Sequence, residues 1–173
     1  MHNIVLIGYM GSGKSTVGAR LSDRLGIPFE DTDKMIEREQ GMSVSEIFEK
    51  YGEESFRRME TELLSKLLEK EVGMVLALGG GTPMRQENQE AIKALGTVVY
   101  LRTKPETVLK RLKGDTTRPL LAGANAGEKV RAMMETRNPV YEALSDVAVD
   151  TDEKKLQRIV DEIEEKMNEI TRY

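Results

Sequence analysis

The sequence has no cysteine, and its single histidine is His2. Without cysteine the chain has no disulfides, thiolate nucleophiles or thiolate metal ligands. One histidine supplies neither a histidine-based catalytic triad nor a multi-histidine metal site. Any acid–base catalysis must therefore fall to carboxylates, and we expect a reducing, cytoplasmic setting.

Long apolar runs and an excess of positive charge are also missing. No stretch approaches the ~20 apolar residues that span a bilayer, and the apolar run at residues 3–7 lacks the flanks of a signal peptide. Lys and Arg number 26 against 30 Asp and Glu. The net charge therefore gives no overall electrostatic field that would attract a polyanion such as DNA. We expect a monomer with small-molecule partners, and neither nucleic acid nor membrane.

Short apolar runs alternate with longer stretches of helical composition in this chain of 173 residues, a length that suits one domain, 1–173. The predicted strands are 3–7, 28–30, 74–78, 97–101 and 147–149, and the predicted helices are 14–25, 43–51, 53–71, 86–95, 105–113, 128–144 and 153–170. Strands that are apolar at successive positions indicate a sheet covered on both faces. The alternation predicts a three-layer α/β/α fold with a mainly parallel sheet.

Residues 8–16 read GYMGSGKST, which fits the phosphate-binding pattern GxxxxGK[ST] between a predicted strand and a predicted helix. In such a loop, backbone N–H groups bind phosphate oxygens, the lysine bridges the β- and γ-phosphates, and the serine hydroxyl binds Mg²⁺. A glycine-rich turn with a solvated lysine is the alternative. The motif predicts binding of ATP and Mg²⁺ by Gly11, Ser12, Gly13, Lys14, Ser15 and Thr16.

Asp31 and Asp33 follow the second predicted strand, at the edge where open α/β sheets bind ligands. One carboxylate there can hold water around Mg²⁺, and a second can accept a proton from an attacking hydroxyl. Capping of the next helix by Asp31 or Thr32 is the alternative. Arg57 follows on a predicted helix, where an ordinary surface pair with Glu53 is the competing interpretation.

Three consecutive glycines, Gly79, Gly80 and Gly81, follow the third predicted strand. They allow a backbone to approach a ligand closely, although a flexible turn is also possible. Residues 114–127 form a predicted loop, either a lid or a disordered segment, which contains Arg118. Arg137 lies on the helix after it, and either arginine taken alone could simply be solvated.

In their order and spacing these segments resemble shikimate kinases. The resemblance rests on the phosphate loop and on DTD at 31–33, FRRME at 56–60, GGGT at 79–82, RPLL at 118–121 and RNPVY at 137–141. It implies the phosphate-loop NTPase fold of the nucleoside-monophosphate-kinase type, with a parallel sheet in the order 2-3-1-4-5. It also implies a helical acceptor-binding region at about 32–61 and a mobile lid at about 112–126.

The resemblance further implies a reaction, which is γ-phosphoryl transfer from ATP to the 3-hydroxyl of shikimate. By the same resemblance, Arg57 and Arg137 clamp the shikimate carboxylate, and Glu60 orients Arg57. Asp33 contacts the ring hydroxyls and is the candidate base, while Asp31 acts on Mg²⁺ through water together with Ser15. The backbone at residues 79–81 lies against the ring.

On the nucleotide side, the resemblance implies that Arg118 closes over the transferring phosphoryl group and acts with Lys14 on its charge. Arg111 matches the position that stacks on adenine, and residues 150–153 complete that pocket.

Two alternatives remain open. One is a related kinase for gluconate or a nucleoside monophosphate, against which the three glycines, Arg57 and Arg137 speak. The other is an idle nucleotide-binding module, which would need none of Lys14, Asp33 and Arg118.

Overall fold

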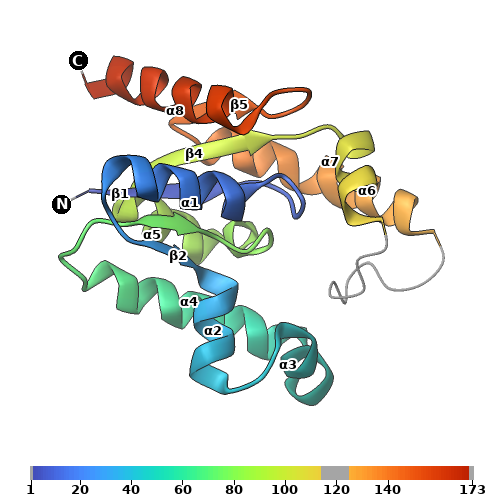
Figure 1. Cartoon of the computed structure of the whole chain (residues 1–173). Coiled ribbons are helices and arrows are strands. Elements are labelled where there is room, and N and C mark those ends of the chain that lie inside the picture. Colours follow the sequence, from blue (N-terminus) through green and yellow to red (C-terminus); the bar gives the residue numbers. More distant parts are fainter. Residues whose placement is uncertain (1, 114–124, 172–173) are drawn as a thin grey trace.

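A five-stranded parallel sheet forms the centre of the computed structural model, which describes residues 2–113 and 125–171 (Figure 1). The strands are β1 (Asn3–Ile7), β2 (Phe29–Asp31), β3 (Val75–Ala77), β4 (Gly96–Arg102) and β5 (Val147–Asp150). Their order is β2-β3-β1-β4-β5, and every neighbouring pair is parallel. The predicted fold class and strand order are confirmed.

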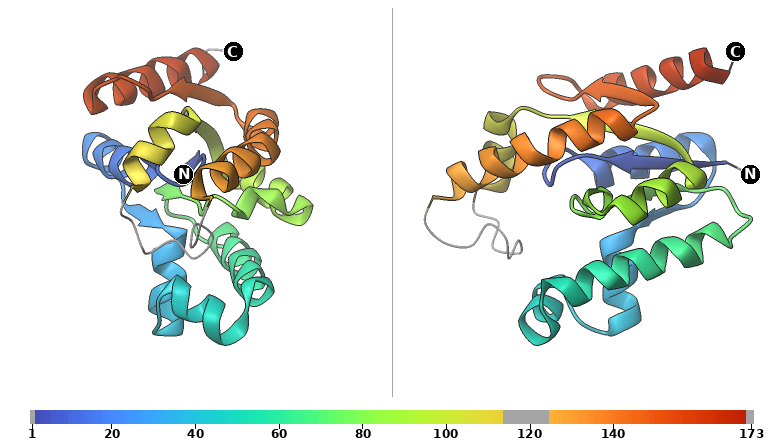
Figure 2. Two further views of the ribbon diagram at one scale, coloured as in Figure 1. Left: turned by 90° about the vertical axis from the view of Figure 1, so that its right-hand side faces the viewer. Right: turned by 180° about the vertical axis from the view of Figure 1, so that it is seen from behind.

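Helices cover both faces of this sheet, as the views in Figures 1 and 2 agree. The helical elements are α1 (Lys14–Leu25), α2 (Thr32–Gln40), α3 (Val44–Tyr51), α4 (Glu53–Leu68), the 3₁₀ turn η1 (Thr82–Met84), α5 (Gln86–Leu95), α6 (Pro105–Leu112), α7 (Ala126–Leu144) and α8 (Leu156–Thr171). Helices α1 and α8 lie on one face and α4, α5 and α7 on the other, while α2 and α3 extend from the β2 edge with the start of α4 as a helical lobe.

Alternate residues of the central strands supply two separate cores. On β1, Ile4 and Leu6 pack in the core beneath α1 and α8, and Val5 and Ile7 belong to the core on the opposite face. All five β1 residues are buried. Because both faces are covered, the strand is apolar at successive positions instead of alternating with polar residues.

Several predicted boundaries shift. Helix α8 begins at Leu156, not at residue 153, because Glu153 has a φ of 58°, a left-handed conformation that a helix cannot contain. Helix α4 ends at Leu68, where the Glu69 and Lys70 N–H groups bond three residues back, which tightens the last turn.

Helix α2 lies inside the helical acceptor-binding region predicted at about 32–61. Its own range is not predicted, because its thin apolar stripe buries Ile36 alone among its large residues. Helix α7 begins at Ala126, two residues early, and Leu112 still belongs to α6. The rest of the predicted lid, with Arg118, lies outside the described residues. Within those residues no helix is both long and apolar enough to cross a membrane.

Candidate active site

The turn between β1 and α1 carries the predicted phosphate loop. Gly11 and Gly13 have φ angles of 77° and 94°, which glycine adopts without steric cost. Helix α1 then begins at Lys14, so an N-terminus with unpaired N–H groups and a positive dipole directly follows the loop. The Lys14 ammonium donates to the carbonyl oxygens of Gly8 at 2.7 Å and Tyr9 at 3.1 Å. The Lys14 side chain therefore lies across the loop whose bound phosphates it is predicted to contact.

Ser15 and Asp31, the two residues predicted at Mg²⁺, are in contact. The Ser15 hydroxyl donates to Asp31 Oδ2 at 2.9 Å. The other carboxylate oxygen accepts from the N–H groups of Asp33 at 2.9 Å and Lys34 at 3.3 Å and so caps α2. The capping and metal interpretations of Asp31 are compatible, because each uses a different oxygen.

These oxygens also fit what Mg²⁺ requires. In the described part of the chain, no group of three or more acidic or histidine side chains could hold a metal ion. Mg²⁺ in kinases typically takes one or two protein oxygens together with waters and substrate phosphates. A serine hydroxyl beside a carboxylate, at the start of the helix after a phosphate loop, suits that mode of binding.

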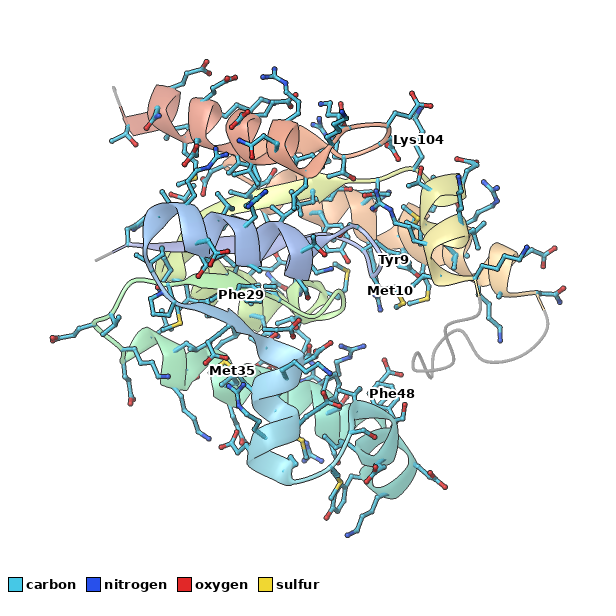
Figure 3. The ribbon with its side chains drawn as sticks, viewed as in Figure 1. Tyr9, Met10, Phe29, Met35, Phe48 and Lys104 are labelled. Carbon is cyan, nitrogen blue, oxygen red and sulfur yellow. The ribbon has the colours of Figure 1, made fainter. Side chains whose placement is uncertain are left out.

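A cavity of about 630 Å³ opens beside this pair, between the phosphate loop and the helical lobe. Met10 of the loop and Phe48 of α3 line it from its two sides, and both are labelled in Figure 3. The cavity is lined by all of the residues that the sequence predicts for binding the metal or the acceptor, namely Ser15, Asp31, Asp33, Arg57, Gly79, Gly80, Gly81 and Arg137.

The glycines after β3 leave room for the polar side chains around them. A Cβ on Gly79 would lie 2.6 Å from Asp33 Oδ1 and 2.9 Å from Glu60 Oε2, and a Cβ on Gly81 would lie 2.4 Å from Arg57 Nη1. Any larger residue would displace these groups. The glycines are therefore needed for close packing against protein side chains, and the predicted close approach to a ligand stays a prediction.

Arg57 is held by acidic neighbours on its own helix. Its guanidinium donates to Glu60 Oε1 at 2.7 Å and to Glu53 Oε1 at 3.2 Å. Burial works against the charged form, but the Glu60 and Glu53 carboxylates outweigh it, so the pKa of Arg57 is raised above its ordinary value. The Thr82 hydroxyl donates to the second oxygen of Glu60, whose side chain is only 1% exposed. Both the expected Glu53 pair and the Glu60 contact are present.

Arg137 reaches the same cavity from α7 on the far side of the glycine turn. It is 8% exposed, and its guanidinium lies over the Tyr9 ring, 5.7 Å from the centroid. A Cβ on Gly80 would lie 3.3 Å from Arg137 Nη1. The two arginines therefore flank the glycine turn, one beside Gly81 and one beside Gly80.

The sequence predicts that Arg111 and residues 150–153 surround adenine, and each makes a contact within the described structure. Arg111 donates to the Gly11 carbonyl oxygen at 2.8 Å, so it lies against the phosphate loop, and its stacking on a base stays a prediction. Asp152, in the segment after β5, accepts from the Lys104 N–H at 3.1 Å. Arg118 cannot be placed, because it lies outside the described residues.

Sequence reasoning missed several residues at this site. Phe48, Phe56, Lys34 and Glu37 line the cavity, and Tyr141 contacts Gly80. A signal existed for Tyr141, since it stands four positions after Arg137 on a predicted helix and therefore on the same face. No such signal existed for Phe48, which reaches the cavity only through the packing of α3 on α4.

Comparison with known proteins agrees with this geometry. A family model described as shikimate kinase matches residues 10–168. The shikimate kinase of Thioalkalivibrio sulfidiphilus is 44% identical over 93% of this chain and 84% of its own length. That of Symbiobacterium thermophilum is 43% identical over 96% of this chain and 97% of its own.

Solved structures agree as well. Shikimate kinase from Acinetobacter baumannii, in complex with shikimate, superposes with a TM-score of 0.93 and 38% identity, over 98% of this chain and 94% of that one. A gluconokinase from Sinorhizobium meliloti shares the fold, with a TM-score of 0.64 at 19% identity, over 98% of this chain and 93% of that one. The sequence matches extend over nearly the whole chain and include both sides of the cavity, so this chain belongs to the shikimate kinase family.

Proposed function

We propose that this chain transfers the γ-phosphoryl group of ATP to the 3-hydroxyl of shikimate, giving shikimate 3-phosphate and ADP. The observation that carries the proposal is that one cavity joins Ser15 of the phosphate loop to Asp33, Arg57 and Arg137. Shikimate has one carboxylate and three ring hydroxyls. The cavity offers guanidinium groups for the first and a carboxylate for the others.

The two arginines would bind the acceptor through its carboxylate. Guanidinium groups form charge-assisted hydrogen bonds to carboxylates, each of about 1.5–3 kcal/mol. Arg57 and Arg137 lie on either side of the glycine turn, so a carboxylate between them would hold the ring against the backbone of Gly80 and Gly81. The absence of side chains there permits that approach.

Asp33 is the proposed base. In the transfer, the 3-hydroxyl oxygen forms a bond to the γ-phosphorus, the bond from that phosphorus to the β–γ bridging oxygen breaks, and the hydroxyl proton passes to the Asp33 carboxylate. Lys14 would stabilise the negative charge on the phosphates, with Arg118 acting from the lid. Mg²⁺, bound near Ser15 and Asp31, would neutralise charge on the β- and γ-phosphates.

The test is ADP release by the purified protein with ATP and Mg²⁺. Parallel reactions contain no acceptor, shikimate, gluconate or one of a panel of nucleoside monophosphates, and a Lys14→Met variant supplies the background. We expect ADP release with shikimate alone, at a rate that the variant does not approach.

The other outcomes are equally informative. Release with gluconate or a nucleotide would move the chain to a sister activity that uses the same fold. Nucleotide binding without acceptor-dependent release would identify an idle module. Either result would contradict the proposal while leaving the phosphate loop as a nucleotide site.

A further inference from the structure

The two arginines of the cavity are held in different ways. Arg57 has Glu60 and Glu53 as ionic partners. Around Arg137, in the described part of the chain, the contacting groups are the Tyr9 ring, the Tyr141 hydroxyl and the Gly80 backbone, and no carboxylate lies within ion-pair distance. The described residues therefore do not neutralise the positive charge of Arg137, and the groups among them that surround its guanidinium are neutral.

Tyr141 lies where it can set that orientation. Its hydroxyl donates to the Gly80 carbonyl oxygen at 2.5 Å, which joins α7 to the glycine turn 61 positions earlier in the chain. Arg137 lies beside the same hydroxyl, because a Cβ on Gly80 would be 3.3 Å from Arg137 Nη1 and 3.4 Å from the Tyr141 oxygen. A phenol has one proton to donate and lone pairs that accept, so this single oxygen donates to the turn and keeps lone pairs for the guanidinium beside it.

The surroundings of Tyr141 make this oxygen rigid. The residue is fully buried, and its ring packs against Tyr100 with centroids 5.3 Å apart. Burial raises the pKa of Tyr141, against a smaller opposing effect of Arg137, so the hydroxyl keeps its proton throughout the physiological range. A fixed, protonated hydroxyl can donate to the Gly80 carbonyl oxygen and present its lone pairs to Arg137 at the same time.

We propose that Tyr141 is a positioning residue for acceptor binding, which locks the Arg137 guanidinium to the Gly80 turn through its hydroxyl. The proposal rests on the proposed function, because it assigns Tyr141 to the carboxylate end of the same acceptor site. Phenylalanine at this position keeps the ring and its packing but removes the hydroxyl, and with it the hydrogen bond to Gly80 and the oxygen beside Arg137. Arg137 would then sample other orientations, and the acceptor carboxylate would meet a less ordered partner.

The experiment compares wild type with Tyr141→Phe, Arg137→Ala and the double variant. It measures kcat/KM for shikimate, the Kd of shikimate and the Kd of Mg·ADP by calorimetry, and Tm. Tyr100→Phe is the matched control, because it removes a hydroxyl from a neighbouring buried tyrosine that, in the described structure, forms no hydrogen bond to Arg137 or Gly80.

Tyr141→Phe is expected to raise the Kd of shikimate about tenfold, the size of one lost hydrogen bond to a charged group. The Kd of Mg·ADP should change by less than about twofold, and in the Arg137→Ala background the second substitution should cost less than about twofold in kcat/KM, because coupled residues are not additive. Tyr100→Phe should leave the Kd of shikimate unchanged.

Three results would overturn the proposal. The first is a loss of kcat/KM from Tyr141→Phe that multiplies the loss from Arg137→Ala in the double variant. The second is a loss of affinity for Mg·ADP by Tyr141→Phe as large as its loss of affinity for shikimate. The third is an effect of Tyr141→Phe on the Kd of shikimate no larger than that of Tyr100→Phe. A wild-type protein that does not bind shikimate would overturn the proposed function as well. A wild type that binds shikimate while the two losses multiply would remove only the positioning role.

Should Tyr141→Phe fail to fold while Tyr100→Phe folds, Gly80→Ala tests the same contact from its other side. The added Cβ would lie 3.3 Å from Arg137 Nη1, close enough to displace it by a few tenths of an ångström, and would touch the Tyr141 oxygen at 3.4 Å. If positioning of Arg137 is the cause, the loss of shikimate affinity disappears in the Arg137→Ala background. A loss that persists there would mean that Gly80 acts on the acceptor directly, and the proposal would fall.

Discussion

The nucleotide side and the acceptor side of the cavity are assembled in different ways. The phosphate loop is one run of consecutive residues, 8–16, between β1 and α1. The acceptor side takes Asp33 from α2, Arg57 from α4, residues 79–81 from the turn after β3, and Arg137 from α7. Local backbone conformation builds the first, and packing between distant segments builds the second.

Their stabilising contacts differ in the same way. Lys14 bonds to carbonyl oxygens five and six positions away, whereas the Thr82 contact with Glu60 spans 22 positions and that of Tyr141 with Gly80 spans 61. Substitutions on the acceptor side should therefore change acceptor affinity or turnover while nucleotide affinity is retained. The following predictions test this separation.

The largest effect is expected from Asp33→Asn. The amide keeps the shape of the side chain but cannot accept the proton of the attacking hydroxyl, so kcat should fall by about 10²–10⁴-fold, the usual size of general-base catalysis. Steady-state kinetics give kcat, and calorimetry with Mg·ADP should give an unchanged Kd.

Asp161→Asn is the control for Asp33→Asn, since it changes only surface contacts, with Arg24 and Gln157. Turnover by Asp33→Asn at the rate of this control would show that positioning suffices and that Asp33 is not an essential base.

Arg57→Ala and Arg137→Ala should each weaken shikimate binding by about 10–100-fold, because each removes a charge-assisted hydrogen bond. Their stabilities should differ. Arg57→Ala leaves the buried Glu60 carboxylate without its cation, which costs about 3–5 kcal/mol where a buried pair is broken. Arg137 has no carboxylate within ion-pair distance in the described chain, so Arg137→Ala should unfold closer to wild type.

Urea unfolding separates these two variants, and Glu60→Gln combined with Arg57→Ala should recover part of the lost stability. Equal weakening of Mg·ADP and shikimate by either arginine variant would contradict the separation of the two sides.

Thr82→Val should cost about 1–3 kcal/mol of unfolding free energy, because one oxygen of buried Glu60 loses its donor. The same change should loosen Arg57 and raise the KM for shikimate more than that for ATP. The control is Asn3→Ala, which removes two buried hydrogen bonds at the amino end of β1, far from the cavity. If both variants lose stability and raise the two KM values alike, Thr82 has no positioning role.

The smallest effect is expected from alkaline pH. Burial raises the pKa of Tyr100 to about 12, whereas an unfolded tyrosine ionises near about 10. The unfolded state therefore loses its proton first, so the contribution to stability is complete below about pH 10 and is lost as pH rises towards 12.

Chemical unfolding between pH 8 and 11.5 should show this fall in wild type and a shallower one in Tyr100→Phe. Identical curves would contradict the assignment to Tyr100.

Much of the fold could be predicted because both cores follow from local patterns. The continuous apolar run of β1 reports burial on two faces, and the helical spacing of Val17 and Leu21 reports α1. Helix α2 was not given a range, because its Asp31 cap was one of two interpretations and its apolar stripe is thin. The early end of α4 depends on tightened hydrogen bonds that no composition signals.

By itself, the sequence determined the phosphate loop, since glycines at fixed spacing with Lys14 and Ser15 need only a strand before them and a helix after them. It also identified the candidate acceptor residues through the resemblance. The tertiary structure alone decided how they meet: that Asp31 accepts from the Ser15 hydroxyl, and that Gly80 bonds to Tyr141. The physical reason is range, because a turn conformation is encoded by adjacent residues, whereas contacts across 16 to 61 positions exist only once the sheet and helices have packed.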